Sequence, residues 1–136
     1  MEPNTANLNN PPQVLVVEDD DGIQRYIERV LTDEGYEVLG ARDGSIALKM
    51  LETSHPDLIL LDMYLPTVDG WSFLAQYPRT PLPHAPIIAM SAGIDVKNLP
   101  GVVEGLAKPF TIDALLTRVK RHVPAPTDEQ ASAKPS

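Results

Sequence analysis

Hydrophobic positions along the chain fall into five short runs separated by more polar stretches. The runs cover residues 14–17, 36–41, 58–61, 86–90 and 106–107. An apolar run of this length, bounded by turn residues, is typical of a strand that is buried on both faces of a sheet. We therefore expect five buried strands, the last of them very short.

Between these runs, apolar residues recur at helical spacing. The helical segments are residues 23–31, 46–51, 71–77 and 112–119. Asp20, Asp43 and Thr111 stand just before three of them, as residues that cap helices do. Strands that alternate with helices predict an α/β fold with a parallel sheet covered on both faces, because right-handed crossovers place the helices there.

The two ends of the chain differ in composition from its middle. Residues 1–13 and 124–136 are rich in Pro, Asn, Ser and Thr, with almost nothing to bury, which is typical of disordered tails. We expect one domain over residues 14–123. The chain has 136 residues, and a domain of this size buries roughly two-thirds of its unfolded surface.

Charge and cysteine content narrow the class of function. With 19 acidic and 11 basic residues the net charge is -8, which predicts no binding to nucleic acid or to anionic membranes. A protein partner or a cation fits better. The absence of cysteine excludes disulfides and cysteine-ligated zinc. The first forty residues contain no apolar stretch of signal-peptide length, so the cytoplasm is the default compartment.

Charged residues follow three of the five predicted strands. Glu18 and Asp19 follow the first strand, Asp62 stands where we expect the third strand to surface, and Lys108 follows the fifth. The carboxyl ends of parallel strands share one edge of the sheet, and adjacent strands lie about 4.8 Å apart, so these groups converge if the first and third strands are neighbours. Three close carboxylates repel one another, and a divalent ion such as Mg²⁺ resolves that conflict.

Taken together, these groups predict a phosphoryl acceptor. Asp62 would be the acceptor, Lys108 would bind a phosphoryl oxygen, and the Ser91 hydroxyl would donate one more hydrogen bond. Each residue alone has a structural explanation. Asp62 would cap a strand, Glu18 and Asp19 would form a solvated turn, Lys108 would be a surface lysine, and Ser91 a small residue at a strand end.

Four segments in this order resemble the receiver domains of two-component response regulators, over residues 14–123. They are VLVVEDD, LILLDMYLPTVDG, IIAMSA and LAKPF. The resemblance implies a flavodoxin-like, doubly wound sheet of five strands in the order 2-1-3-4-5, with phosphorylation of Asp62 by a phosphohistidine donor. It also implies Mg²⁺, with Mn²⁺ as a possible substitute, held by Glu18, Asp19, Asp62 and the backbone carbonyl of Tyr64, and a cis bond before Pro109.

The chain departs from this family between Ser91 and Lys108. The segment is shorter than the family's, and Pro100 and Gly101 interrupt it, so we expect a shortened or missing fourth helix, with a loop and at most a turn of helix. Gly105 occupies the position where the family usually has a switch aromatic. By the same resemblance, Tyr64 and Gly93 would tune the lifetime of the phosphoryl group.

Our leading hypothesis is a stand-alone receiver that is phosphorylated on Asp62 by a histidine kinase or a histidine phosphotransfer protein. It would signal through a downstream protein effector in a phosphorelay, as a monomer or weak homodimer, without turning over a separate substrate. The alternative is a receiver that docks partners independently of phosphorylation, which Gly105 and the short fourth-helix segment motivate.

Two enzyme or cofactor classes fit less well. A haloacid-dehalogenase-like phosphohydrolase usually carries a second acid two residues after its nucleophile, where this chain has Tyr64. A flavodoxin would need hydroxyls and backbone amides for the flavin phosphate where the first strand ends in acids. Among the remaining residues, Trp71 is expected to be a packing residue. The basic cluster of residues 118–122 is expected to complement the dipole of the last helix, with a docking patch as the other interpretation.

Overall fold

Ten elements of secondary structure form the part of the domain that the structure describes. The structure, a computed structural model, describes residues 10–65, 68–92, 95–96 and 98–126. The elements are β1 (Gln13–Val17), α2 (Asp21–Asp33), β2 (Glu37–Ala41), α3 (Gly44–Met50), β3 (Leu58–Asp62), α4 (Gly70–Gln76), the 3-10 helix η1 (Tyr77–Arg79), β4 (Ile87–Ser91), β5 (Val102–Ala107) and α5 (Ile112–His122).

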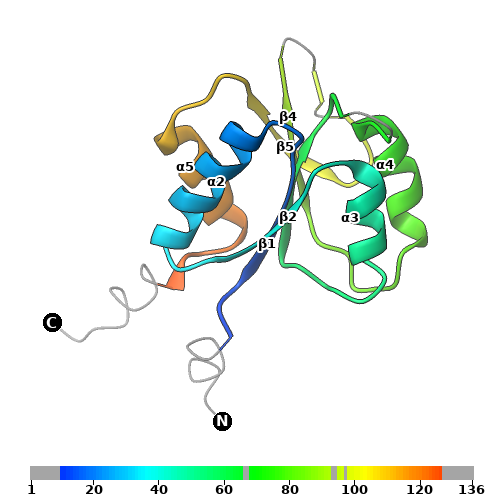
Figure 1. The fold of residues 1–136 in the computed structure, drawn as a ribbon, viewed down its shortest axis with the longest axis horizontal. Helices are drawn as coiled ribbons and strands as arrows, with labels where there is room; N and C mark the ends of the chain where they lie inside the picture. The colour runs from blue at the N-terminus through cyan, green and yellow to red at the C-terminus, as the bar shows by residue number, and fades with distance from the viewer. Residues whose placement is uncertain (1–9, 66–67, 93–94, 97, 127–136) are drawn as a thin grey trace, which may run out of the picture.

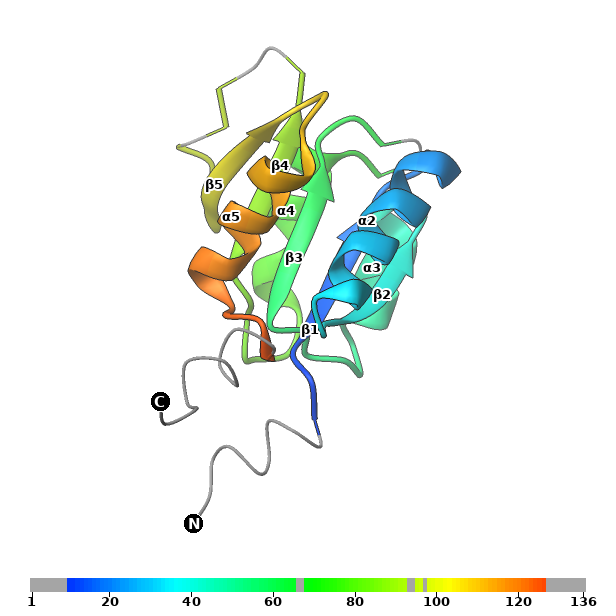
Figure 2. The ribbon, with the colours of Figure 1, turned by 90° about the vertical axis from the view of Figure 1, so that its left-hand side faces the viewer.

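The five strands form one parallel sheet in the order β2-β1-β3-β4-β5. Helices α2 and α5 cover one face, and α3 and α4 cover the other (Figure 1). Figure 2 looks onto the face covered by α2 and α5, where the arrowheads of β3 and β4 point toward the same edge of the sheet. The predicted flavodoxin-like, doubly wound α/β fold with this strand order is confirmed.

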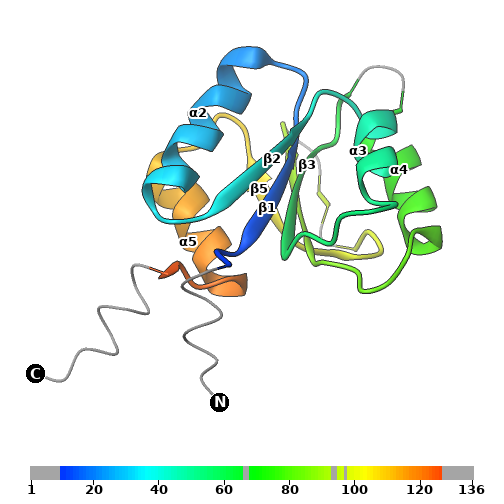
Figure 3. The same cartoon turned by 60° about the horizontal axis from the view of Figure 1, so that its bottom comes forward.

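Alternate residues of each central strand feed two separate cores. On β3, Leu58 and Leu60 pack with residues of α2 and α5, whereas Ile59 and Leu61 pack with residues of α3 and α4. The apolar run is therefore continuous because both faces of the strand are covered (Figure 3). This burial extends to the end of the strand. Asp62, expected where β3 surfaces, is only 3% exposed, so that expectation was wrong.

Side-chain caps start all four α-helices of the described chain. Asp20, Asp43, Asp69 and Thr111 accept hydrogen bonds from backbone N–H groups of the first turns of α2, α3, α4 and α5. Each satisfies one of the amide groups that a helix leaves unpaired at its N-terminus. Because these caps are local, they hold the helices in place directly after the strand ends.

The connection from β4 to β5 lacks the fourth helix, as far as residues 92, 95–96 and 98–101 describe it. The prediction of a shortened or missing helix is confirmed. The predicted start of the last strand was wrong, because β5 begins at Val102 rather than Leu106. Val102 pairs with Ile87 and packs against one core, and Glu104 binds side chains of α5, so contacts distant in sequence extend the strand.

A valine from this connection fills the space above Gly105. Val96 is 3% exposed and belongs to the core on the α3 and α4 side. A Cβ atom on Gly105 would lie 2.8 Å from Val96 Cγ2, a distance that side chains do not tolerate without shifting. The absence of a side chain at Gly105 therefore permits the valine to pack on β5.

Most residues of the expected tails, 1–13 and 124–136, lie outside the described residues. Three described residues differ from a disordered tail: the Pro12 carbonyl accepts from the Glu37 N–H, Gln13 belongs to β1, and Ala125 is fully buried in the core on the α2 and α5 side. Within the part of the chain that the structure describes, no helix combines the length and apolar character that crossing a membrane requires.

Candidate functional site

The predicted charged residues meet at the carboxyl edge of the sheet, where β1 and β3 lie side by side. Val17 of β1 pairs with Leu61 of β3. Glu18, which follows β1, and Asp62, the last residue of β3, therefore lie side by side. Sequential connections leave β1 and β3 in opposite directions at this point, which is where ligands bind in open α/β sheets. The site therefore lies where the sheet topology predicts it.

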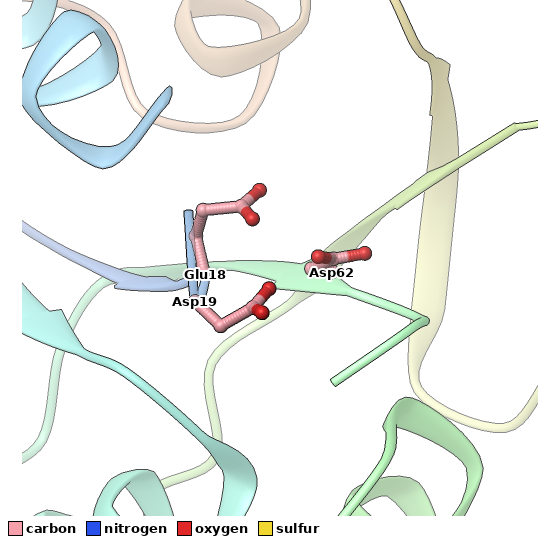
Figure 4. A group of neighbouring side chains, drawn as sticks. All are labelled: Glu18, Asp19 and Asp62. Atoms are coloured by element: carbon pink, nitrogen blue, oxygen red, sulfur yellow. The ribbon is translucent and has the colours of Figure 1, made fainter. Parts of the chain in front are cut away.

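Three carboxylates form the acidic part of the site (Figure 4). One oxygen from each of Glu18, Asp19 and Asp62 lies within 4.8 Å of the others. Glu18 is 1% exposed and Asp62 is nearly as buried, whereas Asp19 is exposed. All the potential ligands are carboxylate oxygens, which suits a hard divalent cation such as Mg²⁺ that retains some of its water.

Lys108 brings a positive charge from β5 into this group. Its Nζ atom lies 2.8 Å from Glu18 Oε1 and 3.3 Å from Asp62 Oδ2. The Lys108 N–H donates to the Ser91 carbonyl, which extends the β4–β5 ladder to the lysine. The bond between Lys108 and Pro109 is cis, as the resemblance implied. The lysine is therefore held by its backbone as well as by its ion pairs.

Burial and charge shift the ionisation of the two most closely paired groups. Burial raises the pKa of Glu18 and the charge of Asp62 adds to this, although hydrogen bonds from Lys108 and the Asp20 amide act in the opposite direction. Burial alone would lower the pKa of Lys108, but its hydrogen bond to Glu18 and the charges of Glu18 and Asp62 raise it. Lys108 is therefore firmly protonated, and Glu18 resists ionisation.

Two further predicted residues lie next to the Asp62 carboxylate along the chain or across the sheet. The Tyr64 N–H donates to Asp62 Oδ1 at 3.0 Å, which holds the backbone of Tyr64 beside that carboxylate. Asp62 pairs with Met90, so Ser91 stands one residue farther along β4, where it is 4% exposed. The structure thus gathers most of the predicted site around Asp62.

The remaining predicted positions are not part of this cluster. Gly105 lies on β5 beneath Val96. Gly93 and the family's proline, Pro66, fall outside the described residues. The sequence also gave no reason to place Trp71 near the site, because it was interpreted as packing. Trp71 is 42% exposed, and its ring contacts the ring of Tyr64.

Comparisons with known proteins agree with this geometry. The family model of the response regulator receiver domain matches residues 14–120. Transcriptional regulatory protein AfsQ1 of Streptomyces coelicolor is 35% identical over 108 residues, which cover 79% of this chain and 47% of that protein. Response regulator MprA of Mycolicibacterium vanbaalenii is 33% identical over 115 residues, which cover 81% of this chain and 49% of that protein. The chain thus spans about half the length of these curated relatives.

A solved structure with the same fold contains a metal. The receiver domain of the sensor histidine kinase PA1611 from Pseudomonas aeruginosa PAO1 is 32% identical, with a TM-score of 0.74 over 82% of this chain and 96% of that one. It holds a magnesium ion coordinated in its active site cleft. Receiver domains bind Mg²⁺ in an acidic pocket, and this chain has an acidic cluster at the corresponding edge of the sheet. On the match over residues 14–120 and these relatives, the chain belongs to the response regulator receiver domains of two-component signalling.

Proposed function

We propose that this receiver domain accepts a phosphoryl group on Asp62 from a phosphohistidine donor, either a histidine kinase or a histidine phosphotransfer protein. The observation that most supports this is a cluster of three carboxylates, two of which contact one lysine. Their oxygens lie within 4.8 Å of one another, and Lys108 contacts the two buried carboxylates. A buried cluster of this kind favours a cation and an incoming group that carries negative charge to the lysine.

Magnesium would be held by Glu18, Asp19, Asp62 and the Tyr64 backbone carbonyl, and Mn²⁺ would be able to replace it. The ion supplies positive charge that offsets the repulsion among the carboxylates and the incoming phosphoryl oxygens. The hydrogen bond that the Tyr64 N–H donates to Asp62 Oδ1 supports the place of Tyr64 in this set, because it holds the Tyr64 backbone beside the carboxylate.

In the transfer, a carboxylate oxygen of Asp62 forms a bond to phosphorus while the bond between phosphorus and the donor's imidazole nitrogen breaks. The imidazole leaves with the electron pair of that bond. Lys108 exchanges its contact with Asp62 for one with a phosphoryl oxygen, and the Ser91 hydroxyl donates to another. Tyr64 and Gly93 would then influence how long the acyl phosphate persists.

The product would act through protein partners rather than by turnover of a separate substrate. Phosphorylation adds charge at a buried site and shifts the balance between two conformations of the domain. AfsQ1 is named as a transcriptional regulatory protein, but this chain matches less than half of it. The net charge of -8 argues that the receiver itself does not bind nucleic acid. We propose that this domain receives the phosphoryl group from its donor in the cytoplasm and then signals to a downstream protein.

Intact mass spectrometry after incubation with a small phosphodonor and Mg²⁺ tests the proposal. We expect one acid-stable, base-labile phosphoryl adduct, lost in Asp62→Ala and in EDTA. Asp20→Asn is the matched control, because it changes a neighbouring acid while retaining a residue that caps α2. An adduct that persists in Asp62→Ala would move the acceptor elsewhere, and no adduct from folded, Mg²⁺-bound protein would contradict the proposal.

Phosphorylation-independent docking is the second candidate. It is favoured by Gly105 and by the lack of a helix in the described part of the β4–β5 connection. Under this alternative, a partner binds the native chain and Asp62→Asn with equal affinity, with or without a phosphodonor. Under the main proposal, the phosphodonor changes the affinity of the native chain only.

A further inference from the structure

Two exposed aromatic side chains meet beside the proposed acceptor. Tyr64 lies just beyond β3 and Trp71 lies in the first turn of α4, and their rings contact edge to face with centroids 5.7 Å apart. Tyr64 is 53% exposed and Trp71 is 42% exposed, and neither belongs to a buried core. Packing of the core therefore does not account for the contact.

The backbone on both sides of this pair is fixed. The Tyr64 N–H donates to Asp62 Oδ1, which ties the residue to the carboxylate. The Gly70 N–H donates to the Met63 carbonyl, and a Cβ on Gly70 would lie 2.6 Å from Met63 Cα. The start of α4 is thus in close contact with the residue between Asp62 and Tyr64, so Trp71 stands at a fixed distance from the acceptor strand.

With both backbones held, the remaining freedom is the rotation of the Tyr64 side chain. An edge-to-face contact between aromatic rings biases such a rotation by about two- to tenfold. Without Trp71, the half-exposed ring of Tyr64, two residues beyond Asp62, would spread over more rotamers and spend less time in its present orientation against the indole. A change in that orientation is able to alter the approach of water to the neighbouring carboxylate.

We propose that Trp71 is a positioning residue that holds the Tyr64 ring over the mouth of the acceptor site and thereby slows hydrolysis of the aspartyl phosphate. This inference rests on the proposed acceptor function. In hydrolysis, a water oxygen bonds to phosphorus, the bond between phosphorus and the Asp62 oxygen breaks, and inorganic phosphate leaves. Trp71 takes no part in these bonds and acts only through Tyr64.

The test follows loss of the phosphoryl group from the full chain after removal of the phosphodonor. We expect Trp71→Ala to shorten the lifetime by about two- to tenfold, and Trp71→Phe, which keeps a ring, to remain within about twofold of the parent. In a Tyr64→Ala background, Trp71→Ala should have no further effect. Tyr26→Ala removes another exposed ring, whose centroid lies 6.4 Å from that of the partly buried Phe110, and should leave the lifetime unchanged.

An unchanged or longer lifetime in Trp71→Ala, or an effect that persists in full without Tyr64, would overturn the inference. A second measurement applies even if no phosphoryl adduct forms. The native chain has no cysteine, so Asp62→Cys introduces a single thiol at the acceptor position. Its alkylation by iodoacetamide should become about two- to tenfold faster with Trp71→Ala, and only when Tyr64 is present. Equal alkylation rates would reject the positioning role independently of phosphorylation.

Discussion

The edge of the sheet that carries Asp62 and the connection between β4 and β5 are built on opposite principles. At the first, charged groups are buried together, and Glu18 resists ionisation because of that burial. At the second, a valine packs on a glycine, and the polar groups of β5 bind side chains of α5. One region accepts a cost in stability to gather reactive groups, and the other is packed for stability.

The outer edge of β5 is protected by α5. Ser91 pairs with Ala107, and the Lys108 N–H donates to the Ser91 carbonyl, so the N–H and C=O of Ala107 itself point away from β4. The carbonyl of Gly105, two residues before Ala107, therefore faces outward, and Arg118 Nε donates to it at 2.9 Å. Glu104 in turn holds Arg121 and His122. Arg118, Arg121 and His122 of the basic cluster are thus engaged with β5, so contacts within the domain account for them without a docking patch.

We infer from this contrast that the proposed phosphorylation depends on the sheet edge that carries Asp62. Transmission of the signal to a partner would depend on the β4–β5 region. Replacing a residue of the site should change the reaction with little effect on the fold. Replacing a residue of the β4–β5 region should change stability or association and leave the reaction nearly intact. The following substitutions test that separation.

Lys108→Ala should have the largest effect. Loss of the charge that would meet the phosphoryl oxygen is expected to slow phosphorylation of Asp62 by about a hundredfold. Mg²⁺ affinity should stay equal or rise, because a competing cation leaves the carboxylates. Initial rates from intact mass and titration with Mg²⁺ measure the two quantities. Lys49→Ala, on the exposed face of α3, is the matched control, and a Lys108→Ala rate close to the parent's would contradict the assigned role.

The site was predictable because its signals are local. Acidic residues directly after apolar runs, and a lysine directly before a proline, stand at strand ends whatever the rest of the chain does. The parallel order of the strands then brings those ends together. The helix starts were predictable for the same reason, since Asp20, Asp43 and Thr111 cap the residues that follow them.

The start of β5 was not predictable from the sequence. Pro100, Gly101 and Gly105 are turn-forming residues, and they indicated a loop. The strand forms because Val102 packs on a distant core and because Glu104 binds α5, contacts that span about 15 residues or more. The burial of Asp62 and the contact of Trp71 with Tyr64 likewise depend on how β3 and α4 pack, which no local pattern records.

Gly105→Ala should destabilise the fold while sparing the reaction. The new Cβ would lie 2.8 Å from Val96 Cγ2, so the connection must shift, at a cost of about 1–3 kcal/mol in the free energy of unfolding. Urea unfolding measures this cost. Gly22→Ala, in an exposed part of α2, would place its Cβ 3.2 Å from Asp20 Oδ1, an exposed side chain that is able to shift, and alanine favours helices, so it should change stability less than Gly105→Ala does. If Gly105→Ala lowers the rate of phosphorylation as much as Lys108→Ala does, the two regions do not have separate roles.

Glu18→Gln should shift stability in the other direction. Burial raises the pKa of Glu18, so the folded chain keeps this proton to higher pH than the unfolded chain, whose glutamate has its ordinary value near 4.5. The stability contributed by the group is therefore full below pH 4.5 and is lost as pH rises through the raised pKa. We expect Glu18→Gln to be more stable than the parent at about pH 8 without metal, and equal to it at about pH 4.

Urea unfolding in EDTA at the two pH values tests this expectation, with the exposed Glu52→Gln as the control. The glutamine oxygen is still able to accept the hydrogen bond from Lys108, so the comparison isolates the charge. A variant less stable than the parent at about pH 8 would mean that the ion pair with Lys108 outweighs the burial of Glu18. The site would then be stabilising, and the contrast with the β4–β5 region would fail at that point.

Arg118→Ala should produce the smallest loss of stability but a change in association. It removes the hydrogen bond to the outward carbonyl of Gly105 and one to the Ala114 carbonyl, at a cost of about 1 kcal/mol. An unprotected strand edge is a template for pairing with another chain, so sedimentation should show more self-association than in the parent. Arg29→Ala, which breaks only an exposed ion pair with Asp33, should change neither quantity measurably. If Arg118→Ala stays as monomeric as Arg29→Ala at high concentration, the hydrogen bond from the arginine to Gly105 is not what closes the edge.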